Sequence, residues 1–241
     1  MKKIITMLII LTLVITISGC ASTSKGAQQS SVSNIGYDYT MNSSLDLSLV
    51  YKNIDTLIAD AEIIVEGKVL ETNSIVVGNN VLTKFKLQVT NSLKDTKIKG
   101  QIMELASVGG IVSVEDFLKA NKPVEKSFEI NTLEKLTANE KKTKKIKATM
   151  GEFPLIESGK EYIIFGKKDH LASGESIYVP LGVAQGVFEI DITNNIIPFS
   201  RYGNEIVNNK ESKENFINNI IKVKNTAKSY VSMLIIDQLR M

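Results

Sequence analysis

The sequence predicts a mainly β protein with flanking helices, in which a small antiparallel barrel carries a lysine-rich insertion and ends in a C-terminal helix. Three observations predict this fold. Apolar and polar residues alternate over 62–107 and again over 160–200, which is the period of a strand. Residues 111–150 interrupt that rhythm, and helical spacing appears before the first strands and after the last.

The chain begins with a segment typical of an export signal, residues 1–19. Lys2 and Lys3 precede Ile4–Ile17, a run that is apolar apart from three threonines. A membrane-spanning helix needs roughly 20 apolar residues, whereas the apolar region of a secretory signal needs about 7–15. We therefore predict a signal peptide over residues 1–19 and not a permanent membrane span.

The signal ends at Cys20, the only cysteine in the chain. The residues Ile17-Ser18-Gly19-Cys20 resemble the lipobox of bacterial lipoproteins. The resemblance implies that Cys20 carries diacylglycerol and becomes the first residue after cleavage. The alternative is an ordinary secretory peptide with a chance cysteine. A lipidated Cys20 could not act as a nucleophile or metal ligand, and we expect the chain on the outer face of the cell membrane.

Composition limits the class of protein further. The formal net charge is +3, and removal of residues 1–19 takes away two lysines, so the remaining chain is almost neutral. This charge does not indicate a nucleic-acid-binding protein. The abundance of Ile, Lys and Asn reflects A+T-rich codons and favours a Gram-positive source of low G+C content.

Residues 20–43 are predicted to be the lipidated cysteine and a flexible tether, since 21–34, "ASTSKGAQQSSVSN", holds almost only small and polar residues. A single domain is expected to fill residues 44–241. Its first element is predicted as a helix over 44–61, because Leu47, Tyr51, Ile54 and Ile58 recur at helical spacing. Ser43, Ser44 and Asp46 could cap this helix.

Strands follow. The clearest is Val81–Val89, in which every second residue is apolar or threonine, and Gly78-Asn79-Asn80 is expected to form a hairpin turn before it. A preceding strand is predicted near 63–69 and a third over 101–107. The pattern resumes at 160–167, 176–180, 186–192 and 196–199, with a tight turn at 193–195. A helix is expected near 211–236.

The insertion, residues 111–150, is predicted to be partly helical and largely solvated. Between residues 119 and 147 it carries nine lysines and four glutamates. The densest basic run could contact anionic lipid or a wall polymer, or it could be a solvated face; it comprises Lys141, Lys142, Lys144, Lys145 and Lys147. We favour the solvated face, because the run lacks the apolar side of an interfacial helix.

Strongly twisted sheets of this size often close and remove their edges, as in an oligonucleotide/oligosaccharide-binding (OB) barrel. The stretches "ADAEIIVEGKV" (59–69), "PLIESGKEYIIFGKK" (154–168) and "GVAQGVFEI" (182–190) resemble a pattern of bacterial surface proteins. The pattern is similar, more distantly, to the netrin-like barrels of tissue inhibitors of metalloproteinases. The resemblance implies the fold alone. Those inhibitors chelate zinc with a free N-terminal cysteine held by disulfides, and this chain has no second cysteine.

No catalytic, cofactor or metal-binding residue is predicted. His170 is the single histidine, so a catalytic triad would have to use it. It lies in a polar stretch that indicates a solvated loop. Zinc sites need several histidines or cysteines. The carboxylate pairs Glu189/Asp191 and Asp55/Asp60 are interpreted as surface charge. Gly109-Gly110 and Gly182/Gly186 match no phosphate-binding loop and are expected in turns.

These observations leave three hypotheses for function. The preferred one is a membrane-anchored, non-catalytic lipoprotein whose barrel binds a protein, a peptide or a cell-surface polymer. The second is a small exported hydrolase that uses carboxylates only, and it would need two carboxylates converging in one pocket. The third is a solute-binding accessory lipoprotein, a class that is usually built from two α/β lobes.

Overall fold

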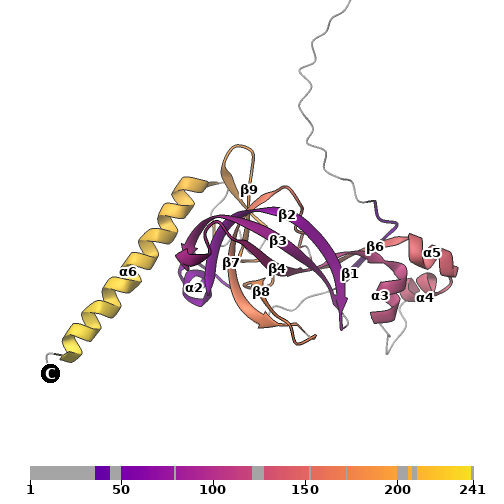
Figure 1. Cartoon of the computed structure of the whole chain (residues 1–241), viewed down its shortest axis with the longest axis horizontal. Helices are drawn as coiled ribbons and strands as arrows, with labels where there is room; N and C mark the ends of the chain where they lie inside the picture. Colours follow the sequence, from indigo (N-terminus) through magenta and orange to yellow (C-terminus); the bar gives the residue numbers. More distant parts are fainter. Residues whose placement is uncertain are drawn as a thin grey trace, which may run out of the picture. The chain divides into compact units, whose positions relative to one another are not determined.

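The computed structural model describes residues 36–43, 50–78, 80–120, 128–151, 153–171, 173–199, 206–207 and 211–239 (Figure 1). Side chains at 120, 128, 129 and 227–239 are not part of this description. The chain divides into residues 1–35 and a unit of residues 36–241. The predicted signal peptide, Cys20 and the tether over 21–34 therefore lie outside the described residues. Among the helices described, none has the length and apolar character that crossing a membrane requires.

Five strands form a closed ring, in the order β7-β2-β3-β4-β8, with β8 returning to β7. These strands are β2 (Ile63–Val77), β3 (Asn80–Lys94), β4 (Ile102–Val108), β7 (Glu161–His170) and β8 (Ser176–Pro180). Every neighbouring pair is antiparallel except β4 and β8, which meet in parallel at Leu105 and Tyr178. This closure confirms the predicted OB-like barrel, a five-stranded Greek-key arrangement.

Three short strands extend the sheet beyond β7. They are β9 (Val187–Ile190), β10 (Asn195–Pro198) and β11 (Glu211–Ser212). The turn between β9 and β10 contains Asn194 at φ 58°, a left-handed conformation that asparagine tolerates. The predicted tight turn at 193–195 is confirmed.

The alternation that predicted β3 also determines how the barrel is filled. Phe85, Leu87 and Val89 are almost completely buried, so this strand has the orientation that its sequence predicted. The barrel bends sharply at Gly67, where a register shift occurs between Glu66 and Gly67. A Cβ atom at Gly67 would lie 2.5 Å from the carbonyl oxygen of Gln88, so only glycine allows these two strands to approach.

Helix α2 (Ile54–Asp60) and the first turns of α6 (Lys213–Leu239) pack against the barrel. Both contribute to a core cluster with β7 and β9, through Leu57 and Ile58 of α2 and Phe216 and Ile220 of α6. The C-terminal helix near 211–236 is thus confirmed.

The helix predicted over 44–61 is shorter than expected. Asn53 caps α2, and its side-chain oxygen accepts a hydrogen bond from the backbone N–H of Thr56 at 2.9 Å. Tyr51 is not helical, because its backbone N–H donates to Oε1 of the buried Gln185 at 3.1 Å. Ser43 ends a strand and does not cap a helix, and residues 44–49 lie outside the described residues.

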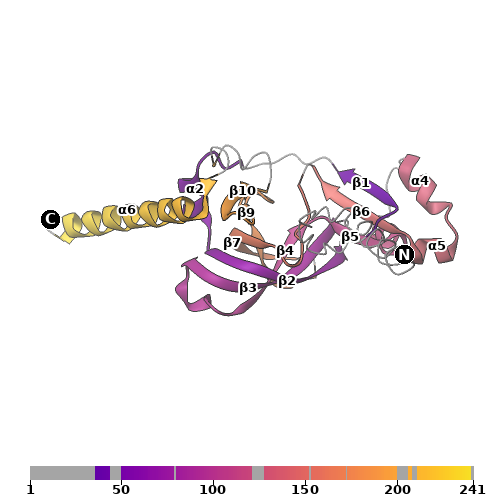
Figure 2. The ribbon, with the colours of Figure 1, turned by 90° about the horizontal axis from the view of Figure 1, so that it is seen from above.

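The insertion differs most from expectation. It contains β5 (Gly110–Ser113), α3 (Val114–Ala120), α4 (Phe128–Glu134), α5 (Ala138–Thr143) and β6 (Lys145–Met150). With β1 (Tyr39–Ser43), strands β6 and β5 form a three-stranded sheet in the order β1-β6-β5, which we call the small sheet (Figure 2). Its core includes Val112, Val114, Phe117, Leu133 and Ile146.

The small sheet adds to one prediction and corrects another. The insertion is partly helical, as predicted, and most of its described residues are at least partly exposed, but it also buries an apolar cluster to which α3, α4 and β6 contribute. The tether was expected to extend to residue 43, but Tyr39–Ser43 pairs in parallel with Ile146–Met150. No local sequence pattern indicates that β1 and β6 pair, since the two strands are about a hundred residues apart in the chain.

Candidate functional site

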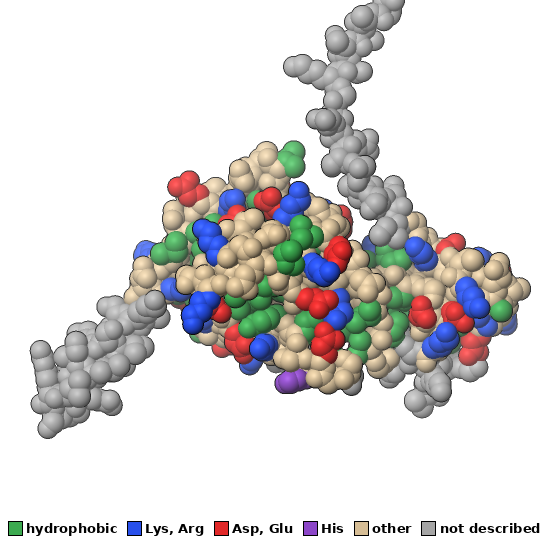
Figure 3. Space-filling view, in the orientation of Figure 1, with side chains coloured by type: hydrophobic (Ala, Val, Ile, Leu, Met, Phe, Trp, Pro, Cys, Tyr) green, Lys and Arg blue, Asp and Glu red, His purple; other side chains and the backbone are tan. Residues whose placement is uncertain are grey.

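The predicted basic run lies at the start of β6. Lys141 and Lys142 belong to α5, Lys144 follows that helix, and Lys145 and Lys147 belong to β6. The run is not a free cationic patch. Lys144 pairs with Glu140 at 3.2 Å and lies 5.8 Å from the centre of the Tyr39 ring. Around α5, basic and acidic side chains are mixed (Figure 3).

The same lysines hold the first strand. Lys147 lies 5.3 Å from the centre of the Tyr37 ring, a cation–π geometry. The backbone N–H of Asp38 donates to the Lys145 carbonyl at 2.8 Å, and the backbone N–H of Lys145 donates to Asp38 Oδ2 at 2.8 Å. Lys144 and Lys147 of this run therefore pack against Tyr39 and Tyr37, a role that no local pattern indicates because the partners lie far away in sequence.

The carboxylate pairs do not converge. Glu189 is engaged with Lys160 at 3.2 Å, whereas Asp191 accepts hydrogen bonds from Thr193 within a turn. Asp60 accepts a hydrogen bond from the Tyr51 hydroxyl at 3.0 Å, and Asp55 is exposed in the first turn of α2. The pairs serve turns and ion pairs in the described part of the chain.

His170 was expected in a loop, but it is the last residue of β7 and pairs with Ser176 of β8. Its side chain is exposed, as expected. Within the described ranges, no group of three or more His, Cys, Asp or Glu side chains could hold a metal ion.

The motifs that carried the resemblance have structural roles. Gln185 is fully buried; besides accepting from the Tyr51 N–H, its Nε2 donates to the Tyr51 carbonyl at 3.4 Å. Burial raises the pKa of the Tyr51 hydroxyl to about 12, and the hydrogen bond to Asp60 adds to this. Tyr162 is fully buried, and its hydroxyl accepts the Glu157 N–H at 3.2 Å. These contacts explain the pattern without invoking a reaction.

The outer face of β3 and β4 is the surface on which OB barrels bind oligonucleotides and oligosaccharides. Here its lysines are paired with carboxylates: Lys84–Glu175 at 2.7 Å, Lys84–Glu104 at 3.7 Å and Lys86–Glu71 at 2.6 Å. Binding of a nucleic acid depends on free lysines and arginines that displace counterions from phosphates. This face is therefore poorly suited to a polyanion.

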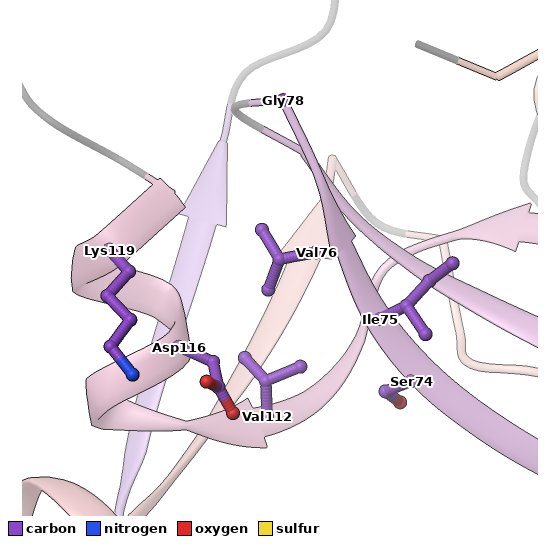
Figure 4. Close-up of a pocket in the computed structure, with 7 residues that line it drawn as sticks. All are labelled: Ser74, Ile75, Val76, Gly78, Val112, Asp116 and Lys119. Atoms are coloured by element: carbon purple, nitrogen blue, oxygen red, sulfur yellow. The ribbon is translucent and has the colours of Figure 1, made fainter. Parts of the chain in front are cut away.

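A groove of about 530 Å³ lies where the barrel meets the insertion. Figure 4 shows α3 on one side, with Asp116 and Lys119, and β2 on the other, with Ser74, Ile75 and Val76. Val112 of β5 lies at its base, and Gly78 marks the hairpin at the end of β2. The lining on the β2 and β5 side is apolar apart from Ser74, and the α3 side carries one acid and one base.

The β2 side of the groove is an open strand edge. Strand β2 pairs with β7 only over Ile63–Lys68, whereas it pairs with β3 as far as Val77. The Val81 carbonyl accepts a hydrogen bond from Gly109 N–H, so Val81 faces away from β2. Its partner Val76 must then point its own N–H and C=O away from β3 and toward the groove. The same alternation applies to Ser74.

The β5 side of the groove is a second strand edge. Val114 N–H donates to the Lys144 carbonyl, so Val112 and Val114 face β6 while Ile111 faces away from it. The N–H of Ile111 donates to Ser74 Oγ at 2.9 Å, which joins the two edges at one point. A Cβ atom at Gly110 would lie 2.6 Å from Ser74 Oγ, so glycine is needed there.

No pattern in the sequence indicates this groove. Its residues come from β2, β5 and α3, and none belongs to a motif for chemistry. Comparison with protein-family models, with curated proteins and with solved structures gave no match. The candidate site therefore rests on its geometry.

Proposed function

We propose that this protein is a lipid-anchored lipoprotein on the outer face of the cell membrane that binds a protein, peptide or polymer in the groove between β2, β5 and α3. The observation that carries the binding role is the open groove, which combines apolar walls with backbone groups that face into it. Binding sites are typically concave, largely apolar and supplied with a few polar groups that fix orientation.

Anchoring is supported by the Ile17-Ser18-Gly19-Cys20 sequence. Diacylglycerol supplies two chains, and two acyl chains hold a protein stably on a membrane where one does not. Cys20→Ala is expected to abolish incorporation of labelled fatty acid and to leave the signal uncleaved. Equal labelling of the wild type and the variant would contradict the anchor.

Binding in the groove is tested on intact cells with a photo-reactive amino acid. Placed at Lys119 in the groove wall, it is expected to give a discrete cross-linked product. The matched control is Lys222 on α6, which is also exposed and lies outside the groove. Products that are the same from both positions, or absent from both, would contradict a binding role for the groove.

A further inference from the structure

We propose that the groove takes an extended peptide that adds to β2 as a new strand; this inference rests on the proposed binding function. The open edge is the starting observation. Over Glu71–Val77 no described residue pairs with β2 on the side away from β3. A row of unpaired N–H and C=O groups is a template for another strand, and such addition is an established mode of peptide recognition.

The edge is produced by an irregularity in the strand. A register shift occurs between Val69 and Glu71, just beyond the last backbone–backbone hydrogen bonds on that side of β2, which Val69 makes with Lys160 and Gly159. Bulges of this kind bend a strand and terminate its pairing. Beyond it, β2 runs on beside β3 alone as far as Val77. At a rise of about 3.3 Å per residue, the open portion extends roughly 20 Å, enough for a short peptide strand.

The unsatisfied groups can be named. The N–H and C=O of Ser74 and of Val76 point into the groove, and both residues are partly exposed. In the described part of the chain no hydrogen bond is made by these backbone groups. Water can satisfy these groups singly, whereas an extended peptide presents alternating donors and acceptors at the matching spacing and can bond to them together.

The side chains around the edge specify the kind of peptide. Val76 and Val112 line the inner wall and belong to or pack against the apolar core of the small sheet. Alternate residues of an added strand face opposite ways, so every second peptide side chain should be apolar. Asp116 and Lys119 carry opposite charges on the α3 wall, so the groove favours neither an acidic nor a basic peptide.

Val76→Pro is the most direct test of this geometry. Proline has no N–H, and it is tolerated on an edge where that N–H faces away from the neighbouring strand. The pairing of β2 with β3 should therefore persist while one groove-facing donor is lost. The matched control is Val76→Ala, which shortens the side chain but keeps the backbone donor.

The measurement uses the full chain in detergent micelles and an acetylated, amidated hexapeptide of alternating threonine and valine. Binding is followed by NMR through the amide signal of Ser74, which all three proteins keep. We expect binding at millimolar peptide or below by the wild type. Val76→Ala should bind more weakly only by the lost apolar contact, and Val76→Pro should bind about tenfold more weakly than Val76→Ala, since a peptide carbonyl then also loses its partner. A second arm methylates alternate peptide nitrogens, and only one of the two methylation registers should prevent binding.

Three outcomes would overturn the proposal. These are equal binding by Val76→Ala and Val76→Pro, no binding by the wild type at millimolar peptide, or concentration-dependent dimerisation through the same edge, which would make a second copy the occupant. If Lys119 still gives its cross-linked product but the wild type does not bind the peptide, the proposed binding function is retained and the proposal of strand addition is rejected. If Val76→Pro does not fold, the two methylated peptides on the wild-type protein decide the question alone.

Discussion

The barrel and the small sheet solve the problem of strand edges in different ways. In the barrel, β8 returns to β7 and the ring closes, so its ring strands have neighbours on both sides along much of their length. The small sheet does not close. Its order β1-β6-β5 leaves β1 and β5 as outer strands, and it depends on β1, a strand from the far N-terminal end of the described chain.

This difference indicates a division of roles. The barrel has two large apolar clusters, whereas the small sheet has one smaller cluster and is joined to β2 through the Ile111–Ser74 hydrogen bond. Regions with fewer buried contacts open more readily than the core. The groove lies at the junction, where a rigid strand faces a more easily opened layer.

The largest expected effect comes from the barrel core. Phe85 is 1% exposed, and Phe85→Ala should lower the free energy of unfolding by about 3–5 kcal/mol, from lost burial and the cavity left behind. The neighbouring Lys86→Ala, on the outer face, should leave stability unchanged. Urea unfolding followed by circular dichroism measures both. Equal loss in the two variants would show that β3 is not oriented as described.

A substitution of the same kind in the small sheet should act locally. Ile146 is fully buried, and Ile146→Ala should speed hydrogen exchange at the amides of β1, β5 and β6. The amides of Phe85 and Leu87 in β3 should keep their protection, because local opening need not involve the global transition. Uniform acceleration throughout the chain would mean that the two regions unfold as one unit.

The basic run allows a gentler test of the small sheet. Changing Lys141, Lys142, Lys144, Lys145 and Lys147 together to Gln removes the cation–π contacts with Tyr37 and Tyr39. We expect faster exchange in β1, whereas a purely solvated face would leave folding unaltered. Binding of the unlipidated chain to anionic vesicles should be weak before and after the change, and weaker with salt, since screening acts over about 8 Å at physiological ionic strength. Complete sedimentation of the unlipidated wild type at that salt would instead identify a lipid-binding surface.

The smallest effect concerns pH and helix α5. The backbone N–H and the hydroxyl of Thr137, followed by Lys144, lower the pKa of Glu140 to about 2. Because the folded-state pKa lies below the ordinary value, the stabilisation is complete above that value and is lost as pH falls toward 2. Hydrogen exchange in α5 should quicken in that window. Glu140→Gln should remove the dependence, and a persistent dependence would point to another group.

The strands of the barrel could be predicted because their signal is local. Alternation in Val81–Val89 reports which face is buried, whatever the strand pairs with. The closure itself depends on a parallel contact between Leu105 and Tyr178, which no local pattern encodes. The helix predicted over 44–61 failed for a related reason. The helical spacing of apolar residues includes Tyr51, but the backbone of Tyr51 forms hydrogen bonds with the buried side-chain amide of Gln185 and is not helical.

The groove could not be predicted at all. It is defined by the pairing that β2 lacks over Glu71–Val77 among the described residues, and a missing partner leaves no pattern in the sequence of β2 itself. The basic run was visible, but its aromatic partners Tyr37 and Tyr39 were placed in the predicted tether. The composition of residues 21–34 predicts a tether, and it gives no indication that the segment beginning at Tyr39 pairs with β6.

The parallel pairing of β1 with β6 has a mechanical consequence. The N-terminal end of β1 leads toward Cys20, while the C-terminal end of β6 leads to Phe153, which is buried in the barrel core. A pull between the membrane and the barrel would therefore draw the two strands from opposite ends. All the hydrogen bonds of the pair would bear the load at once, rather than breaking one after another as in a zipper. The first described strand, β1, would thus act as a shear joint between the predicted anchor and the barrel.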